Sequence, residues 1–358
     1  MQVAIVGAGG AGLLHALAFR AHGVAVTDVF DPDPARARNL AALCGARATT
    51  SLDVLADSEA SCVSICSPPR WHVAQAARCA RDGRAVFVEK PVAVSSAELA
   101  RLRSVPGCVP IVQWRAGRAI RGLRAALGEF LLGPSPNVCV DLTLRRSASY
   151  FAAGPGTREG WGAGALLSVG IHAIDAACFA LDRAVLRVQS VLGPCEPGAM
   201  ERTAGIIVAF SGGATGVIRV TFDGGGDDVR MAFAGGGVSA TLTGGEVDPT
   251  AGRVEWKTAD ATKRARLEAV ERASGGHTSA PLLVPYLGDA IAALRAGVAP
   301  GGSGALPSIE DVSCAHAIAL CASERSEAAQ ADSPAESAYS PCARRSAATA
   351  CSCACCIR

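Results

Sequence analysis

The sequence predicts an α/β protein in which a doubly wound parallel sheet is followed by an α+β domain with a large open, mainly antiparallel sheet. Three observations lead to this prediction. The chain has 358 residues, which is enough for two hydrophobic cores. Short apolar strands alternate with helical stretches up to about residue 117. Consecutive strand-like runs, separated by glycine-rich turns, follow between residues 186 and 242.

The first domain is assigned to residues 1–117 and is expected to hold strands and helices in alternation. We expect strands at residues 3–6, 24–30, 62–66, 85–88 and 109–113. Helices are expected at residues 11–22, 34–44, 71–81 and 95–104. Such alternation predicts a parallel sheet with helices on both of its faces.

The second domain is assigned to residues 118–327, because the alternation ends near residue 117. Helices are expected at residues 117–127, 165–181, 281–296 and 308–323, and strands at 137–145, 186–191, 203–210, 213–222, 229–233 and 238–242. Strands that follow one another through glycine turns predict antiparallel pairing. Residues 328–358 are rich in Ala, Ser and Cys without an apolar period, so we predict a disordered tail.

The composition narrows the classes of partner. The formal net charge is +2, which gives no reason to expect nucleic acid or an anionic membrane surface. No apolar run reaches membrane-spanning length and no secretory signal is visible, so we expect a soluble, cytoplasmic protein. The 15 cysteines are then expected to be reduced thiols, five of them crowded into the tail with a spacing that matches no zinc site. No metal site is predicted.

A glycine-rich loop near the N-terminus predicts a nucleotide site. Residues 7–12 match the pattern G-x-G-x-x-G, after a predicted strand and before a predicted helix, and supply Gly7, Gly9, Gly10 and Gly12. The glycines allow a tight turn, and they let a pyrophosphate approach the positive end of the helix dipole.

Asp31 ends the second predicted strand, about twenty residues beyond the loop, where an acid accepts hydrogen bonds from the ribose hydroxyls. Because a carboxylate repels a 2′-phosphate, the expected cofactor is NAD. NADP stays open, since Arg36 or Arg38 could turn toward such a phosphate. The alternative for residues 31–34 is a turn that only caps a helix.

Three further motifs follow in order along the chain. Residues 67–72 read Ser-Pro-Pro-Arg-Trp-His, residues 88–91 read Val-Glu-Lys-Pro, and residues 161–175 form a glycine-rich lead into G-x-H-x-x-D. With the glycine loop, these motifs make the chain resemble the Gfo/Idh/MocA family of NAD(P)-dependent oxidoreductases, the relatives of glucose–fructose oxidoreductase and inositol dehydrogenase. The resemblance implies a Rossmann domain and a sugar or polyol dehydrogenase or ketoreductase. Its hydride would pass between NAD(H) and a hydroxyl-bearing carbon of a sugar, nucleotide sugar or cyclitol.

The resemblance also implies roles for single residues. Lys90 is expected to hydrogen-bond the reacting hydroxyl, before a peptide bond that is often cis, and His172 to exchange the proton of that hydroxyl. Asp175, three residues further on, could orient the imidazole or support its helix face. The alternatives are a surface lysine paired with Glu89 and a histidine satisfied inside the core.

The nicotinamide is expected to be bordered by residues of the two middle motifs. These are Ser67, Pro68, His72 and Glu89. For His72, packing at the start of a helix is the alternative.

Ser168 departs from the family's pattern, because many relatives carry an aspartate four residues before the histidine. Serine carries no charge, so the resemblance shifts toward members that rely on lysine and histidine alone, such as those acting at C3 of nucleotide-linked sugars. Further substrate contacts are expected from Arg115, Tyr150, Arg158 and Trp161, since guanidinium groups suit an anionic substrate and aromatic faces suit sugar rings. The alternative for any single arginine is a solvated surface charge.

Two other functions stay open at this point. An NAD-dependent glycosidase would oxidise its sugar only transiently, and a regulator of the same fold would bind the cofactor without turnover. The presence of Lys90 and His172 argues against the regulator. We also expect a homodimer or homotetramer built through the open sheet, because its strands alternate apolar and polar residues and would expose an apolar patch in a monomer.

Overall fold

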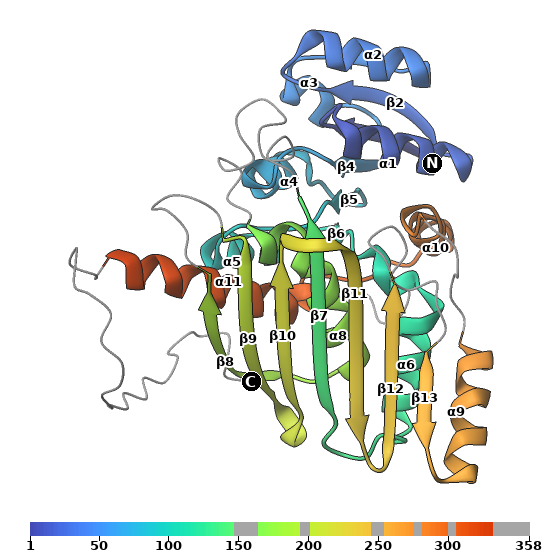
Figure 1. Ribbon diagram of the computed structural model, residues 1–358. Helices are drawn as coiled ribbons and strands as arrows, with labels where there is room; N and C mark the ends of the chain where they lie inside the picture. Colours follow the sequence, from blue (N-terminus) through green and yellow to red (C-terminus); the bar gives the residue numbers. More distant parts are fainter. Residues whose placement is uncertain (147–163, 194–200, 245–253, 275–280, 300–305, 332–358) are drawn as a thin grey trace.

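The computed structural model describes residues 1–146, 164–193, 201–244, 254–274, 281–299 and 306–331, with the backbone alone for residues 323–331. Within these ranges the chain forms a six-stranded sheet followed by a seven-stranded sheet, as Figure 1 shows. The predicted fold class, a parallel sheet followed by an α+β part with a mainly antiparallel sheet, is confirmed. The boundary near residue 117 stays a prediction.

The first sheet is parallel throughout, in the strand order β3-β2-β1-β4-β5-β6. Its strands are β1 (Gln2–Val6), β2 (Ala25–Phe30), β3 (Arg47–Thr49), β4 (Cys62–Ile65), β5 (Ala85–Val88) and β6 (Cys108–Pro110). Its helices are α1 (Gly10–Ala21), α2 (Pro34–Cys44), α3 (Leu52–Ala56), α4 (His72–Cys79) and α5 (Ser96–Arg103). β4 and β5 are buried at every position, as strands covered on both faces must be. The order reverses between β1 and β4, where sheets of this kind bind ligands.

The first sheet departs from the predicted elements in its short pieces. β3 and α3 were not expected, because elements of three and five residues carry little periodicity. The strand expected at residues 109–113 ends at Pro110, and the chain turns into the 3-10 helix η2 (Gln113–Ala116). Trp114 and Arg115 therefore lie in a buried turn.

The second sheet has the strand order β13-β12-β11-β7-β10-β9-β8, with every pair antiparallel except β10 and β7. Its strands are β7 (Asn137–Arg145), β8 (Val185–Leu192), β9 (Thr203–Phe210), β10 (Thr215–Thr221), β11 (Asp223–Gly235), β12 (Val238–Gly244) and β13 (Glu255–Thr258). The accompanying helices are α6 (Arg118–Gly128), α8 (Ile171–Leu181) and α9 (Ala261–Ala273). Neither β13 nor α9 was predicted.

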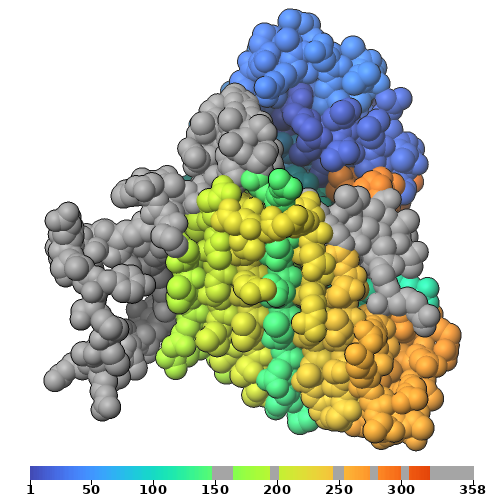
Figure 2. Space-filling model, viewed as in Figure 1, coloured from blue at the N-terminus to red at the C-terminus, as the bar shows by residue number. Residues whose placement is uncertain are grey.

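One face of the second sheet is packed and the other is open. Alternate residues of β7, β9 and β10 are buried, and α8 packs on the buried side of β7 and β11. On the other side Cys139, Ile207 and Val217 are exposed and lie next to one another in register. Figure 2 looks onto this open face, where strands β8 to β12 lie at the surface.

The last two helices, α10 (Leu283–Arg295) and α11 (Ile309–Ala331), return to the first sheet. α10 packs beside α1, where His22 Nε2 lies 2.8 Å from the carbonyl oxygen of Val284. α11 packs beside α5 and α8, and Val92 N donates to His316 Nε2 at 3.1 Å. The C-terminal part of the chain thus bridges the two sheets.

The helix α11 continues to Ala331, so the prediction of disorder is wrong for residues 328–331. Residues 328–331 read Ala-Ala-Gln-Ala, and alanine and glutamine are good helix formers. Residues 332–358, with the cysteine-rich tail, lie outside the described residues. Among the helices that are described, none is long and apolar enough to cross a membrane.

Candidate active site

The glycine loop between β1 and α1 has the shape that a pyrophosphate requires. Gly7 has a φ of +97°, and a Cβ there would lie 2.8 Å from the backbone nitrogen of Ser67. A Cβ on Gly12 would lie 1.9 Å from the carbonyl oxygen of Gly7, so the third glycine is needed for close packing. Above Gly9 and Gly10 the space is open, and the first turn of α1 holds no acidic residue. Backbone amides at this helix start can therefore bind phosphate.

Asp31 follows the end of β2, as the sequence predicts, and its carboxylate is fixed in place. Oδ2 accepts from Ala8 N at 2.8 Å, and Oδ1 accepts from Asp33 N at 2.9 Å. Each oxygen keeps a further lone pair for a ribose hydroxyl. Arg36 lies in an ion pair with Asp33 at 3.5 Å, so its charge is directed to the start of α2.

His72 lies behind the loops that follow β4 and β5 and is almost fully buried. Its Nδ1 is 2.8 Å from the carbonyl oxygen of Pro91, and its Nε2 is 2.8 Å from that of Ser67. Burial lowers the pKa of this imidazole. The Ser67 hydroxyl donates to Gln75 Oε1. This geometry favours packing over a direct nicotinamide contact for His72, while Pro68 stays on the loop that faces the glycines.

Glu89 is held from behind by His15, a residue that the sequence reasoning missed. His15 lies on α1, fully buried, with Nδ1 2.8 Å from Ser64 Oγ and Nε2 2.9 Å from Glu89 Oε1. The other Glu89 oxygen accepts from Lys90 N at 2.9 Å. The available signal was a histidine on the otherwise apolar, buried side of a helix, which demands a polar partner.

The His15–Glu89 pair is charged on both sides. Burial alone would lower the pKa of His15, but the neighbouring Cys66 and Glu89 raise that pKa to about 10. Burial alone would raise the pKa of Glu89, but the hydrogen bond and charge of His15, and then the charge of Lys90, lower that pKa to about 2. The Glu89 carboxylate is thereby fixed under the backbone of Lys90.

Lys90 reaches from the first sheet to the second part of the chain. Its Nζ donates to the carbonyl oxygen of Ser168 at 2.6 Å, and the Lys90–Pro91 peptide bond is cis, as the resemblance implies. Ser168 lies in a π-helical turn, η4 (Leu166–Gly170), just before α8. Turns of this kind are frequent at functional sites. The Ser168 hydroxyl donates to Gly164 O at 2.6 Å, so the backbone rather than the side chain of Ser168 meets the lysine.

His172 lies in the first turn of α8, is partly buried, and is stacked on Trp114. The two ring centroids are 5.3 Å apart and the planes make an angle of 17°. Burial, and then the positive charge of Lys90, lower the pKa of His172 well below its ordinary value. The imidazole is therefore neutral near pH 7 and able to accept a proton. Trp114 was not expected, because its role depends on the turn η2.

Asp175 and Arg115 are paired with each other. Arg115 donates from Nε to Oδ2 at 2.8 Å and from Nη2 to Oδ1 at 2.6 Å, and both side chains are buried. Nη2 also donates to the carbonyl oxygen of Asp311 at 2.9 Å. Within the part of the chain that the structure describes, no hydrogen bond joins Asp175 to His172. Of the two alternatives for Asp175, this geometry favours support of the helix face, and Arg115 turns away from the role of a free substrate ligand.

The remaining predicted substrate residues fall between positions 147 and 163. Tyr150, Arg158 and Trp161 thus lie outside the described residues. The turn that would follow them is anchored by Glu201, whose Oε1 accepts from Leu166 N at 2.9 Å.

The helix that carries His172, which packs on the second sheet, thus lies beside Lys90 at the carboxyl ends of the parallel strands of the first sheet. This is the arrangement of a two-domain nucleotide-dependent oxidoreductase. Residues 1–105 match a family model described as "Oxidoreductase family, NAD-binding Rossmann fold", and residues 138–240 match the "GFO/IDH/MocA C-terminal domain". The chain belongs to the GFO/IDH/MocA oxidoreductase family. The resemblance stated from the motifs and the expectation of an NAD-binding domain are confirmed, and the preference for NAD over NADP stays a prediction.

One known protein is similar to part of this chain in sequence, and two solved structures are similar to most of it in fold. An uncharacterized oxidoreductase of Streptococcus pneumoniae is 39% identical over 74 residues, which span 20% of this chain and only 20% of that protein. The WlbA dehydrogenase of Bordetella pertussis, solved in complex with NADH and UDP-GlcNAcA, superposes with a TM-score of 0.76 at 23% identity, over 92% of this chain and 96% of that one. A levoglucosan dehydrogenase in complex with NADH superposes with a TM-score of 0.72 at 18% identity, over 92% and 97% of the two chains. The two solved structures establish a shared fold.

Proposed function

We propose that this protein is a dehydrogenase or ketoreductase that moves a hydride between NAD(H) and a hydroxyl-bearing carbon of a sugar, nucleotide sugar or cyclitol. One observation carries the proposal. Lys90, which follows the first sheet, donates to the carbonyl oxygen of Ser168 at 2.6 Å, four residues before His172, and its charge lowers the pKa of that imidazole. An ammonium group beside a neutral imidazole is suited to activating a hydroxyl.

Each residue of the site has a separate role in the activation of the hydroxyl. Lys90 carries an ammonium group with three N–H donors, one of which Ser168 O accepts at 2.6 Å, and we assign this group to the substrate oxygen. His172 accepts the hydroxyl proton, and Trp114 keeps its ring in one orientation. NAD, when bound, supplies the hydride acceptor. Its pyrophosphate would be held by the loop of Gly9 and Gly10.

The substrate class is proposed from the neighbours and from the site together. WlbA was solved with UDP-GlcNAcA, a nucleotide-linked sugar, and the other neighbour is a levoglucosan dehydrogenase. An anionic substrate would need a free guanidinium group. Since Arg115 is engaged by Asp175, we assign that contact to Arg158 and the ring contact to Tyr150 and Trp161.

The test is single-turnover hydride transfer with a panel that includes UDP-linked sugars, levoglucosan and inositols. Lys90→Met and His172→Ala should each lose on the order of a hundred- to ten-thousand-fold in rate. Their NADH dissociation constants should stay close to that of the unmodified protein. The matched control is Lys257→Met, because Lys257 is an exposed lysine paired with Glu255 at 3.1 Å. It should change neither quantity.

The outcomes also separate the other candidates. Near-normal transfer by His172→Ala at all pH values would contradict the proton role, and Tyr150 would be tested next. Cleaved glycoside without accumulation of NADH would identify an NAD-dependent glycosidase. Tight NADH binding without turnover on any member of the panel would favour a cofactor-sensing regulator.

A further inference from the structure

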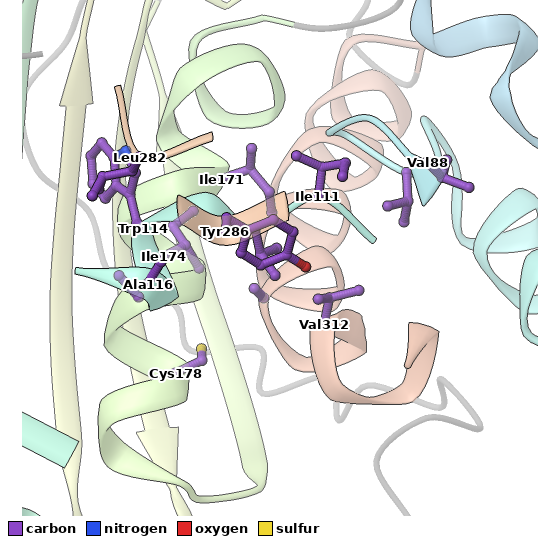
Figure 3. Packing of buried hydrophobic residues seen from close by; sticks show 14 of the residues in the cluster. Val88, Ile111, Trp114, Ala116, Ile171, Ile174, Cys178, Leu282, Tyr286 and Val312 are labelled. Atoms are coloured by element: carbon purple, nitrogen blue, oxygen red, sulfur yellow. The ribbon is translucent and has the colours of Figure 1, made fainter. Parts of the chain in front are cut away.

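Two cysteines from distant parts of the chain meet near the Arg115–Asp175 pair, about one turn of α8 beyond Asp175. Cys178 lies on α8 and Cys314 on α11, 136 residues apart in sequence, and their sulfur atoms are 3.8 Å apart. Cys178 is buried and Cys314 is partly exposed. In Figure 3 Cys178 lies on α8, two turns beyond Ile171, and Val312 marks the facing part of α11.

Cys178 and Cys314 are among the residues that line a cavity of about 1370 Å³ between α6, α8, α10 and α11. Its wall includes Phe179, Arg183 and Tyr286 as well as the two cysteines. A small solute can therefore reach Cys314 without unfolding of the core. This distinguishes the pair from Cys62, Cys79 and Cys108, which are buried in β4, at the end of α4 and in β6.

The surroundings give the two thiols different reactivity. The sulfur–sulfur contact with Cys178 lowers the pKa of Cys314, and the same contact, together with burial, raises the pKa of Cys178. The Asp175 carboxylate disfavours the thiolate at both sulfurs, and the Arg115 guanidinium, with a smaller effect, favours it. The more exposed Cys314 thus ionises first and is the nucleophile of the pair, since the thiolate is the reactive form of a cysteine.

We propose that Cys178 and Cys314 form a dithiol site that a hydroperoxide oxidises to a disulfide. The Cys314 thiolate attacks one peroxide oxygen, the O–O bond breaks, and a sulfenic acid forms on Cys314 while hydroxide leaves and is protonated to water. Cys178 then attacks the Cys314 sulfur, the S–O bond breaks, and the second oxygen leaves as water. With hydrogen peroxide, both thiol protons end in the two water molecules, the sulfurs lose two electrons, and the peroxide gains them.

The disulfide would join the helix that carries His172 to α11. The sulfurs have to approach from 3.8 Å to about 2.05 Å, which a change of side-chain torsion can supply when the Cβ atoms are favourably placed. Oxidation of the dithiol requires no substrate of the proposed dehydrogenase, so the test of this proposal does not depend on the proposed function.

The experiment uses the full-length protein, fully reduced, desalted and exposed to increasing hydrogen peroxide. Remaining thiols are then alkylated, and the non-reduced tryptic digest is analysed by mass spectrometry. We expect a linked peptide pair, containing Cys178 and Cys314, whose mass is the sum of the two peptides less two hydrogen atoms, with Cys321 carrying the alkyl group. Fragmentation must place the link at Cys314, because the same tryptic peptide contains Cys321. Adding a thiol reductant should restore both thiols.

Variants make the result decisive. Cys314→Ser should abolish the link, and Cys178→Ser should leave Cys314 as a sulfenic acid that a dimedone-type probe captures. Cys139→Ser is the control, because Cys139 is exposed on the open sheet face and should leave the link unchanged. A link that survives in Cys314→Ser, or a Cys178 that stays fully alkylated while other cysteines are oxidised, would overturn the proposal.

Discussion

Arg115 and Asp175 form a two-point ion pair in the interior, with donor–acceptor distances of 2.8 and 2.6 Å. The guanidinium comes from the turn η2 that leaves the first sheet, and the carboxylate comes from the middle of α8. The same guanidinium lies 4.9 Å from the ring centroid of Phe179. This pair therefore joins the end of the first sheet to the helix that presents His172.

The first prediction concerns that pair. Asp175→Asn leaves a buried guanidinium without its counter-charge, and we expect a loss of about 3–5 kcal/mol in the free energy of unfolding. Urea denaturation followed by tryptophan fluorescence measures it. Asp141→Asn breaks the exposed pair of Asp141 with Arg219 and should cost only about 0–1 kcal/mol. Equal losses in the two variants would show that burial does not distinguish the pairs.

The second prediction is a pH dependence of stability. The pKa of His15 is raised from 6.5 to about 10, so its contribution is complete below pH 6.5 and is lost as the pH rises toward 10. The pKa of Glu89 is lowered from 4.5 to about 2, so its contribution is complete above pH 4.5 and is lost as the pH falls toward 2. The stability difference between the unmodified protein and a His15→Gln/Glu89→Gln variant should therefore be largest between pH 4.5 and 6.5.

Chemical denaturation at a series of pH values gives that difference. As a control, Arg78 and its partner Asp53 form an exposed pair at 2.6 Å, and Asp53→Asn should leave the shape of the pH profile unchanged. A difference between the unmodified protein and the His15/Glu89 double variant that stays constant from pH 5 to 10 would show that His15 is not a buried imidazolium.

The third prediction concerns the choice between the two cofactors. NADH should bind more tightly than NADPH, because the Asp31 carboxylate would face the 2′-phosphate. Asp31→Ser should weaken the binding of NADH and bring the dissociation constants of NADH and NADPH closer together, as measured by fluorescence titration. Asp53→Ser removes an exposed carboxylate of α3, which is paired with Arg78, and should leave the ratio unchanged. Tighter binding of NADPH by the unmodified protein would refute the preference.

The fourth prediction is that the open face of the second sheet joins two copies of the chain. Ile207 and Val217 are 57% and 51% exposed and lie opposite each other in register on β9 and β10. Ile207→Arg should shift the protein from dimer or tetramer toward monomer in light scattering at micromolar concentration. Leu43→Arg places the same charge on α2, at a residue that is 63% exposed, and should not change the mass. A monomeric unmodified protein would end this idea.

The sequence by itself determined the features that depend on local spacing. Gly7, Gly12 and Asp31 all lie within one β-α-β unit, where the backbone requirements of the turn and the strand end fix the residue types. The alternation of apolar strands and helices indicated the first sheet, and glycine turns between short strands indicated the second. The motifs containing Lys90 and His172 indicated the class of chemistry, because both residues stand beside distinctive neighbours in sequence.

Only the tertiary structure decided which buried polar groups are partners. Arg115 meets Asp175 across 60 residues, Glu89 meets His15 across 74, and Cys178 meets Cys314 across 136. Trp114 reaches His172 only because β6, the last strand of the first sheet, ends at Pro110 and the chain then turns into η2. A buried charge must have a counter-charge, and the sequence shows that demand, but the packing of helices from distant segments selects the residue that meets it.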